Sequence, residues 1–147
     1  MTRPRAISLW QPWAHLWSRG LKRCETRSWR PSGGGWYLVH AGLANDADVR
    51  VAAEPLRTMF PDIDFRTLPR GCFVGRVHVV YALEMTPRLI AEQTDTELAC
   101  GWWEPGRYAW VADGFVTFPT PVPAKGRQGV WTVTDWSDPD DAVEVGL

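Results

Sequence analysis

The stretch from Ile7 to Gly42 constrains the fold most, because its hydrophobic period changes several times within a short length. Residues 6–10 alternate as a short strand, and Pro12 is suited to the first turn of the helix that follows. Gly20 is expected to end this helix, since glycine tolerates the left-handed conformation at helix C-termini. The apolar face of the helix consists of residues at helical spacing: Trp13, Leu16 and Trp17.

A polar segment follows the helix and alternates with the period of a β-strand. One face of the segment carries charges and a ring where a core strand would place apolar groups: Arg23, Glu25, Arg27 and Trp29. Lys22 immediately precedes the segment and adds a cation. The pattern fits either a polar binding site or a surface ion pair, which would contribute only about 0–1 kcal/mol to stability. The flanking aromatic residues favour the binding site.

The central part of the chain predicts one helix and the longest strand. Asn45 is expected to cap a helix that runs to about Glu54, where Pro55 ends it. Residues 71–85 are nearly continuous in apolar or β-branched character, and Gly75 indicates a bulge or a sharp bend within this strand.

The C-terminal part is expected to supply a short helix, a hairpin and a closing strand. Thr86-Pro87 predicts the cap and the first position of the helix. Asp113-Gly114 is the strongest short-range turn signal in the chain and predicts a hairpin between residues 107–111 and 115–118. Residues 130–134 form the last predicted strand.

The chain of 147 residues fits one domain with a single core. We assign residues 1–135 to this domain and predict that the acidic residues 136–147 form a flexible tail. Short bent strands with two or three flanking helices favour a small mixed β-barrel of the α+β class. No apolar run approaches the roughly 20 residues needed to span a bilayer, so we expect a cytoplasmic protein without membrane contact. The sequence leaves the oligomeric state open, and a monomer is the default.

The composition narrows the classes of function. The formal net charge of −1 argues against a protein that coats duplex DNA through bulk electrostatics. The three cysteines are widely spaced, with no histidine cluster nearby, so we expect no metal, no disulfide framework and no cofactor. Ten tryptophans are an extreme number for this length, and tryptophan is favoured where flat apolar area meets a polar ligand.

Two sets of residues give the chain a family resemblance. The first is Ile7-Ser8-Leu9-Trp10-Gln11-Pro12-Trp13, followed by Gly20-x-Lys22-x-x-Glu25-x-Arg27-x-Trp29. The second is Gly106-Arg107-Tyr108-Ala109-Trp110, followed by Arg127-Gln128-Gly129-x-Trp131. With these motifs the chain strongly resembles the ASCH domain family, which is named for its homology to an activating signal cointegrator. The resemblance extends from about residue 5 to residue 135.

The resemblance implies a PUA-like fold, in which helices pack outside a small β-barrel and a cleft lies between the barrel and the first helix. Family members are expected to bind RNA or other nucleic acid through this cleft. We therefore expect a module that binds RNA, another single-stranded nucleic acid or a nucleotide. The residues expected to line its cleft come from both motifs: Trp10, Gln11, Lys22, Glu25, Arg27, Trp29, Tyr108, Arg127 and Gln128.

Each type of residue in this set has a chemical task in nucleotide binding. Arg27 and Arg127 could hold a phosphate through forked hydrogen bonds. Glu25 could accept a hydrogen bond from an exocyclic amine such as cytosine N4. The aromatic residues could stack on a base, which contributes about 1–3 kcal/mol per ring in proteins that bind single strands.

Two other classes of function remain open from the sequence. Some similar small bacterial members hydrolyse N4-acylated cytidine with a lysine base and a threonine nucleophile, and ribonuclease activity has been claimed for others. Lys22 matches that lysine, but Glu25 occupies the position of the threonine, and Thr26 falls on the opposite face of the strand. A hydrolase would need Lys22 and Glu25 as catalytic residues and water as its nucleophile. The third class is a protein-interaction domain that meets its partner through exposed tryptophans.

Overall fold

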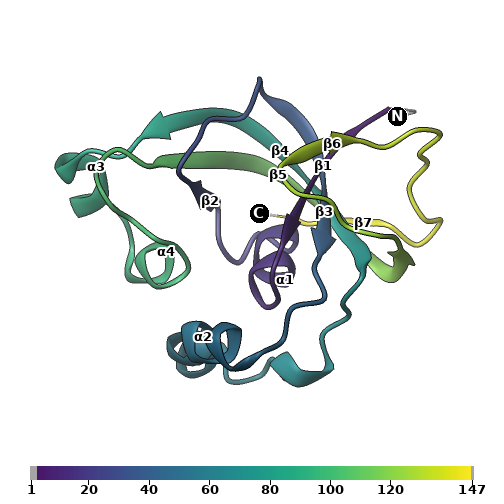
Figure 1. The fold of residues 1–147 in the computed structure, drawn as a ribbon, viewed down its shortest axis with the longest axis horizontal. Coiled ribbons are helices and arrows are strands. Elements are labelled where there is room, and N and C mark those ends of the chain that lie inside the picture. Colours follow the sequence, from purple (N-terminus) through teal and green to yellow (C-terminus); the bar gives the residue numbers. More distant parts are fainter. Residues whose placement is uncertain (1–2, 147) are drawn as a thin grey trace.

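In the computed structural model of the protein, which describes residues 3–146, seven strands form one curled mixed sheet (Figure 1). The strands are β1 Arg5–Leu9, β2 Cys24–Arg27, β3 Gly35–Ala41, β4 Cys72–Glu84, β5 Tyr108–Pro123, β6 Val130–Thr132 and β7 Val143–Glu144. Their order in the sheet is β2-β5-β4-β3-β1-β6, and β7 pairs with β5. β1 and β3 are parallel, and the other strand pairs in residues 3–146 are antiparallel.

Helices lie on one side and at one end of this half-barrel (Figure 1), and the whole is the α+β, PUA-like architecture that the family resemblance implied. The helices are α1 Trp13–Ser18, α2 Ala47–Met59, α3 Pro87–Ala91, α4 Asp95–Ala99 and the 3-10 turn η1 Phe65–Thr67. In Figure 1, α1 lies under the curled sheet, α2 lies beyond α1, and α3 and α4 lie beyond one end of the β4–β5 ribbon. None of the helices in residues 3–146 combines the length and the apolar character needed to cross a membrane.

The main core fills the space between the sheet and α1. Its largest buried side chains are Ile7, Trp17, Tyr37, Trp110 and Phe115. The two buried indoles keep their N–H groups hydrogen-bonded, as burial of tryptophan requires. Trp17 Nε1 donates to the Arg23 carbonyl oxygen at 3.1 Å, and Trp110 Nε1 donates to the Trp29 carbonyl oxygen at 3.1 Å. These two bonds attach the start and the end of the polar β2 segment to the core.

The hairpin predicted at Asp113-Gly114 is wrong, because β5 runs straight through both residues. The register between β4 and β5 shifts here, and Asp113 Oδ1 lies 2.7 Å from His78 Nδ1. A Cβ atom on Gly114 would lie 3.2 Å from the Trp36 ring. Glycine therefore serves close cross-strand packing at this position and forms no turn. The bulge predicted at Gly75 is confirmed by a register shift between Phe73 and Gly75.

The second helix is longer than predicted. Asp46 rather than Asn45 caps it, since the Asp46 side chain accepts a hydrogen bond from the Val49 N–H at 3.1 Å. Pro55 lies inside α2, which continues to Met59. Burial of the apolar face of α2, where Leu56 is fully buried, offsets the backbone hydrogen bond lost at Pro55.

The predicted tail contacts the sheet at several points in residues 136–146, and residue 147 lies outside the described residues. The Trp136 indole is buried, and its ring centroid lies 5.2 Å from that of Phe73. Asp138 accepts a hydrogen bond from Arg76 Nε at 2.8 Å, and β7 then pairs with β5. The acidic composition of the segment hid its apolar anchor, which is Trp136.

Candidate functional site

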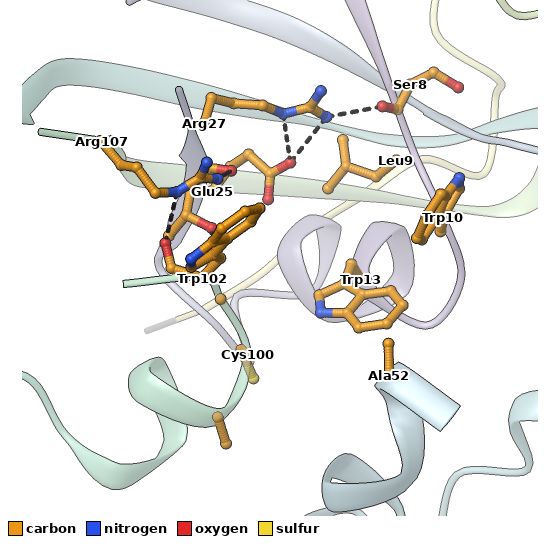
Figure 2. A pocket seen from close by; sticks show the side chains of 13 residues that line it. Ser8, Leu9, Trp10, Trp13, Glu25, Arg27, Ala52, Cys100, Trp102 and Arg107 are labelled. Atoms are coloured by element: carbon orange, nitrogen blue, oxygen red, sulfur yellow. Dashed lines mark hydrogen bonds and ion pairs between the residues drawn. The ribbon is translucent and has the colours of Figure 1, made fainter. Parts of the chain in front are cut away.

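A cleft of about 560 Å³ opens between β2, the turn before α1 and the loop that precedes β5 (Figure 2). Four separate parts of the chain line it. Its lining residues are Ser8, Leu9, Trp10, Trp13, Glu25, Thr26, Arg27, Ala52, Ala99, Cys100, Gly101, Trp102 and Arg107. We call this feature the cleft.

A carboxylate held by two cations forms one wall of the cleft. Lys22 Nζ donates to Glu25 Oε1 at 2.8 Å, and Arg27 Nε donates to Glu25 Oε2 at 2.9 Å. Arg27 Nη2 also donates to the Ser8 carbonyl oxygen at 2.9 Å, which joins β2 to β1 across the cleft wall. Lys22 is wholly buried, whereas 26% of the Arg27 side chain is exposed. The strand period predicted that Glu25 and Arg27 share a face, and their hydrogen bond bears this out.

Glu25 is ionised at neutral pH. Burial alone would raise the pKa of this carboxyl group, but attraction and hydrogen bonding from Lys22 and Arg27 together outweigh burial and hold the pKa below its usual value. An ionised carboxylate only accepts hydrogen bonds. Each Glu25 oxygen still has a second lone pair, so the side chain can accept a donor from a ligand while it keeps both cations.

A stacked guanidinium–indole pair forms the second wall. Arg107 Cζ lies 4.2 Å from the centroid of the Trp102 ring, and Arg107 Nε donates to the Trp102 carbonyl oxygen at 2.9 Å. Thr26 Oγ1 accepts a hydrogen bond from the Trp102 N–H at 3.0 Å, which fixes the backbone at the same residue. The indole itself remains 64% exposed. It is therefore held in place while one of its faces stays available.

Two further indoles stand on the opposite side of Glu25 (Figure 2). Trp10 is 51% exposed, and its ring lies 6.4 Å from that of Trp13 at an interplanar angle of 63°. Trp13 was assigned to the core on its spacing, and it does pack against two core clusters. It also lines the cleft, so one side chain belongs to both the core and the site.

The structure brings together part of the predicted set. Trp10, Glu25 and Arg27 line the cleft, and Lys22 lies directly behind Glu25. Gln11 is buried elsewhere, where its Nε2 donates to the Pro69 carbonyl oxygen at 2.9 Å.

The other predicted residues lie outside this lining. Trp29 packs edge-on against Trp110 at 4.9 Å, and the Tyr108 ring lies 4.9 Å below the Arg30 guanidinium. Arg127 and Gln128 are exposed in the turn before β6.

Sequence reasoning missed Ser8, Thr26, Trp102 and Arg107. Arg107 stood in the second motif but received no role. Thr26 was placed on the far strand face, yet its hydroxyl reaches the rim through the Trp102 N–H. The helix that positions Trp102 also carried a signal, because Thr94 caps α4 and accepts from the Glu97 N–H at 3.2 Å. A threonine followed by glutamate three residues later is a known start of a helix.

The arrangement suits recognition better than acid–base chemistry. In residues 3–146, neither Arg27 Nη1 nor Arg107 Nη1 donates a hydrogen bond to the protein, so both are available to a ligand. The Lys22 ammonium is buried behind Glu25, and a substrate would have to break their ion pair to reach it. Among the same residues no cluster of histidine, cysteine or carboxylate side chains could hold a metal ion.

A known domain family covers most of the chain. The model of the ASCH domain matches residues 7–119, which include every residue that lines the cleft. The chain belongs to the ASCH domain family. ASCH domains are generally regarded as RNA-binding modules. Arg127 and Gln128 lie beyond the matched part of this ASCH domain. No curated protein matches the chain.

Proposed function

We propose that this ASCH domain binds an unpaired nucleotide of RNA in the cleft. The observation that carries the proposal is the ionised Glu25, fixed between Lys22 and Arg27 and flanked by exposed indoles. A protein that reads unpaired nucleotides needs a fixed hydrogen-bonding group for the base edge, a flat surface for the base and a cation for the phosphate. The cleft supplies all three.

The base edge is the task of Glu25. Its free lone pairs favour a base that presents an exocyclic amine, such as cytosine or adenine, over one that presents only carbonyl groups on that edge. Because Lys22 and Arg27 already fix the carboxylate, it loses little conformational freedom when the base binds. This supports selectivity for an amine over a carbonyl.

Trp102 and Trp10 supply the stacking surface. Both indoles are more than half exposed and lie on opposite sides of Glu25 (Figure 2). The Arg107 guanidinium on Trp102 fixes the ring and adds charge beside it. Stacking on such a ring contributes about 1–3 kcal/mol per base.

The charge of the cleft suits a phosphate. Lys22, Arg27 and Arg107 contribute three positive charges and Glu25 one negative charge, so these four side chains carry a net charge of 3 − 1 = +2. The whole chain has a formal net charge of −1, so the attraction is local. This agrees with a small site for one or a few nucleotides and not with a surface that coats duplexes.

The test is a fluorescence titration with nucleosides, single-stranded RNA and duplex RNA, at low and moderate salt. We expect single-stranded RNA to bind in a salt-dependent manner and duplex RNA to bind much more weakly. Arg107→Gln should weaken binding, and Arg88→Gln on the distant helix α3 should not. Equal binding of single strands and duplexes, or turnover of N4-acetylcytidine by the wild-type protein, would contradict the proposal.

A further inference from the structure

A second pocket, of about 270 Å³, lies on the other side of the turn that precedes α1. Gln11 and Pro12 line this pocket, whereas their neighbours Trp10 and Trp13 line the cleft. In α2, likewise, Ala53 faces the pocket and Ala52 the cleft. Since neighbouring Cα atoms are only about 3.8 Å apart, the two sites share a thin wall.

Four arginines and no acidic residue line this pocket, which we call the arginine pocket: Arg50, Arg57, Arg66 and Arg70. Two of them have carboxylate partners outside the lining, since Arg66 pairs with Asp64 and Arg57 with Glu54. Arg50 and Arg70 form no salt bridge with any residue in 3–146. Even with Asp46, whose side chain caps α2, positive charge is in excess here.

Unpartnered donors concentrate in the same place. In residues 3–146, two buried side-chain nitrogen or oxygen atoms lack a hydrogen-bond partner, and they are Arg57 Nε and Arg70 Nε. Arg57 Nε lies 3.3 Å from Glu54 Oε2, within ion-pair distance but without the geometry of a hydrogen bond. Neutral oxygens alone hold the rest of the Arg70 guanidinium: the Leu68 and Phe65 carbonyls and Asn45 Oδ1. Native proteins pair nearly all buried donors, so two exceptions in one pocket point to an anionic ligand with several acceptor oxygens.

The helix geometry presents two further guanidinium groups together. Arg50 and Arg57 are seven residues apart in α2, almost two full turns, and therefore lie on the same face. Ala53 stands between them, and its small side chain leaves room for a ligand. Arg57 Cζ lies 5.5 Å from the centroid of the buried Phe65 ring, which also lines the pocket. No Nη atom of Arg50 or Arg57 donates a hydrogen bond within residues 3–146.

We propose that the arginine pocket binds a phosphate group of the RNA strand whose unpaired base occupies the cleft. This rests on the proposed function of the cleft. Guanidinium forks match the oxygens of a phosphate, and phosphate contacts set the register of a nucleic acid on a protein. Because the two sites share the 10–13 turn as a wall, a strand can pass over Trp10 from one site to the other.

The test compares wild-type protein with the double variant Arg50→Gln/Arg57→Gln, both of whose side chains reach the surface. The probes are a single-stranded RNA of about ten nucleotides, within the usual range of site sizes, a nucleoside and inorganic phosphate. Arg88→Gln is the matched control, since Arg88 is an exposed helix arginine paired with Glu92. Affinity is measured over a series of salt concentrations.

We expect the double variant to bind the RNA about tenfold or more weakly, because each lost charge-assisted contact is strong. The slope of log affinity against log salt should fall in magnitude by about 1.4, or 0.7 for each of two contacts with a single strand. Nucleoside affinity should stay unchanged, and the control should match wild type.

The outcomes separate this inference from the proposed function. If the double variant binds RNA with wild-type affinity and salt slope while Arg107→Gln weakens binding, the arginine pocket has no part in RNA binding and only the cleft assignment survives. If no RNA binds, but inorganic phosphate binds and is lost in the double variant, the anion is a free phosphate. That result overturns the RNA assignment of both sites.

Discussion

The cleft and the arginine pocket both gather guanidinium groups, but they hold them differently. In the cleft, Glu25 and a carbonyl oxygen fix Arg27, and Arg107 is stacked on Trp102. In the arginine pocket, the outer nitrogens of Arg50 and Arg57 bond to no residue in 3–146. A carboxylate fixed beside flat rings can discriminate between base edges, whereas free guanidinium donors can follow a flexible phosphate. The difference indicates that the cleft specifies the base, whereas the arginine pocket attracts the phosphate.

The largest expected effect is on the free energy of unfolding, when the Lys22–Glu25 ion pair of the cleft is compared with the Arg57–Glu54 ion pair of the arginine pocket. Glu25→Gln leaves the wholly buried Lys22 without a counter-ion, and removing one partner of a buried pair costs about 3–5 kcal/mol. Glu54→Gln breaks the ion pair between Arg57 of the arginine pocket and Glu54, and it should cost about 0–1 kcal/mol because 73% of the Glu54 side chain is exposed. Urea denaturation measures both free energies of unfolding. Similar values for the two variants would remove the contrast between the sites.

The next effect concerns stacking. Trp102→Ala should weaken RNA binding by about 1–3 kcal/mol, because a base loses its stacking surface. Stability should change little, since 64% of this residue is exposed. Tyr81→Ala is the matched control, as Tyr81 is also about half exposed but lies outside both sites. Equal losses of RNA affinity in the two variants, measured by fluorescence titration, would show that the position of Trp102 in the cleft has no special part in binding.

A smaller effect should appear with pH, in the helix that carries the shared wall. Burial, followed by repulsion from Arg19, lowers the pKa of His15 in α1 from 6.5 to about 4. The unfolded chain therefore binds the proton first, so this stabilisation is complete above pH 6.5 and is lost as the pH falls to about 4. Partial exposure reduces the expected loss to about 1–2 kcal/mol.

Glu25 also stabilises the fold less as the pH falls, but only below pH 4.5, the ordinary pKa of a glutamate, because the fold lowers the pKa of Glu25. The loss between pH 6.5 and 4.5 should therefore disappear in His15→Gln when stability is followed by urea denaturation. A variant that keeps the full pH dependence in this window would assign it to another group.

The smallest effect is expected at the turn before β6. Arg127 was predicted to hold a phosphate, but it is exposed and lies outside the lining of both sites. Arg127→Ala should change RNA affinity by less than about 1 kcal/mol, as is usual for a rim charge. A loss as large as that of Arg107→Gln in the same titration would extend the RNA path to this turn.

The sequence predicted those parts of the molecule that depend on local periodicity. The strand period placed Glu25 and Arg27 on one face, and Gly75 marked a real bulge. Predictions failed where tertiary contacts override a local signal. Asp113-Gly114 has the chemistry of a turn, but the pairing of β5 with β4 keeps it extended. Buried contacts likewise carry α2 through Pro55.

The site was only partly predictable, because side-chain neighbours depend on the whole fold. Trp29 has the composition of a ligand-binding ring, yet its place against Trp110 follows from the pairing of β2 with β5. Trp102 stands in a loop without any period, and its contacts with Thr26 and Arg107 hold it at the cleft. No sequence pattern predicts the position of Trp29 or of Trp102.

The pairing of β2 with β5 has a consequence for synthesis. The strand that carries Glu25 has its hydrogen-bonding partner in residues 108–111, far along the chain. While a ribosome is still making the middle of the protein, Lys22 and Glu25 must remain in water, because nothing yet exists to enclose them. RNA-binding competence should thus emerge late and all at once, and no N-terminal fragment that carries the signature motif should possess it.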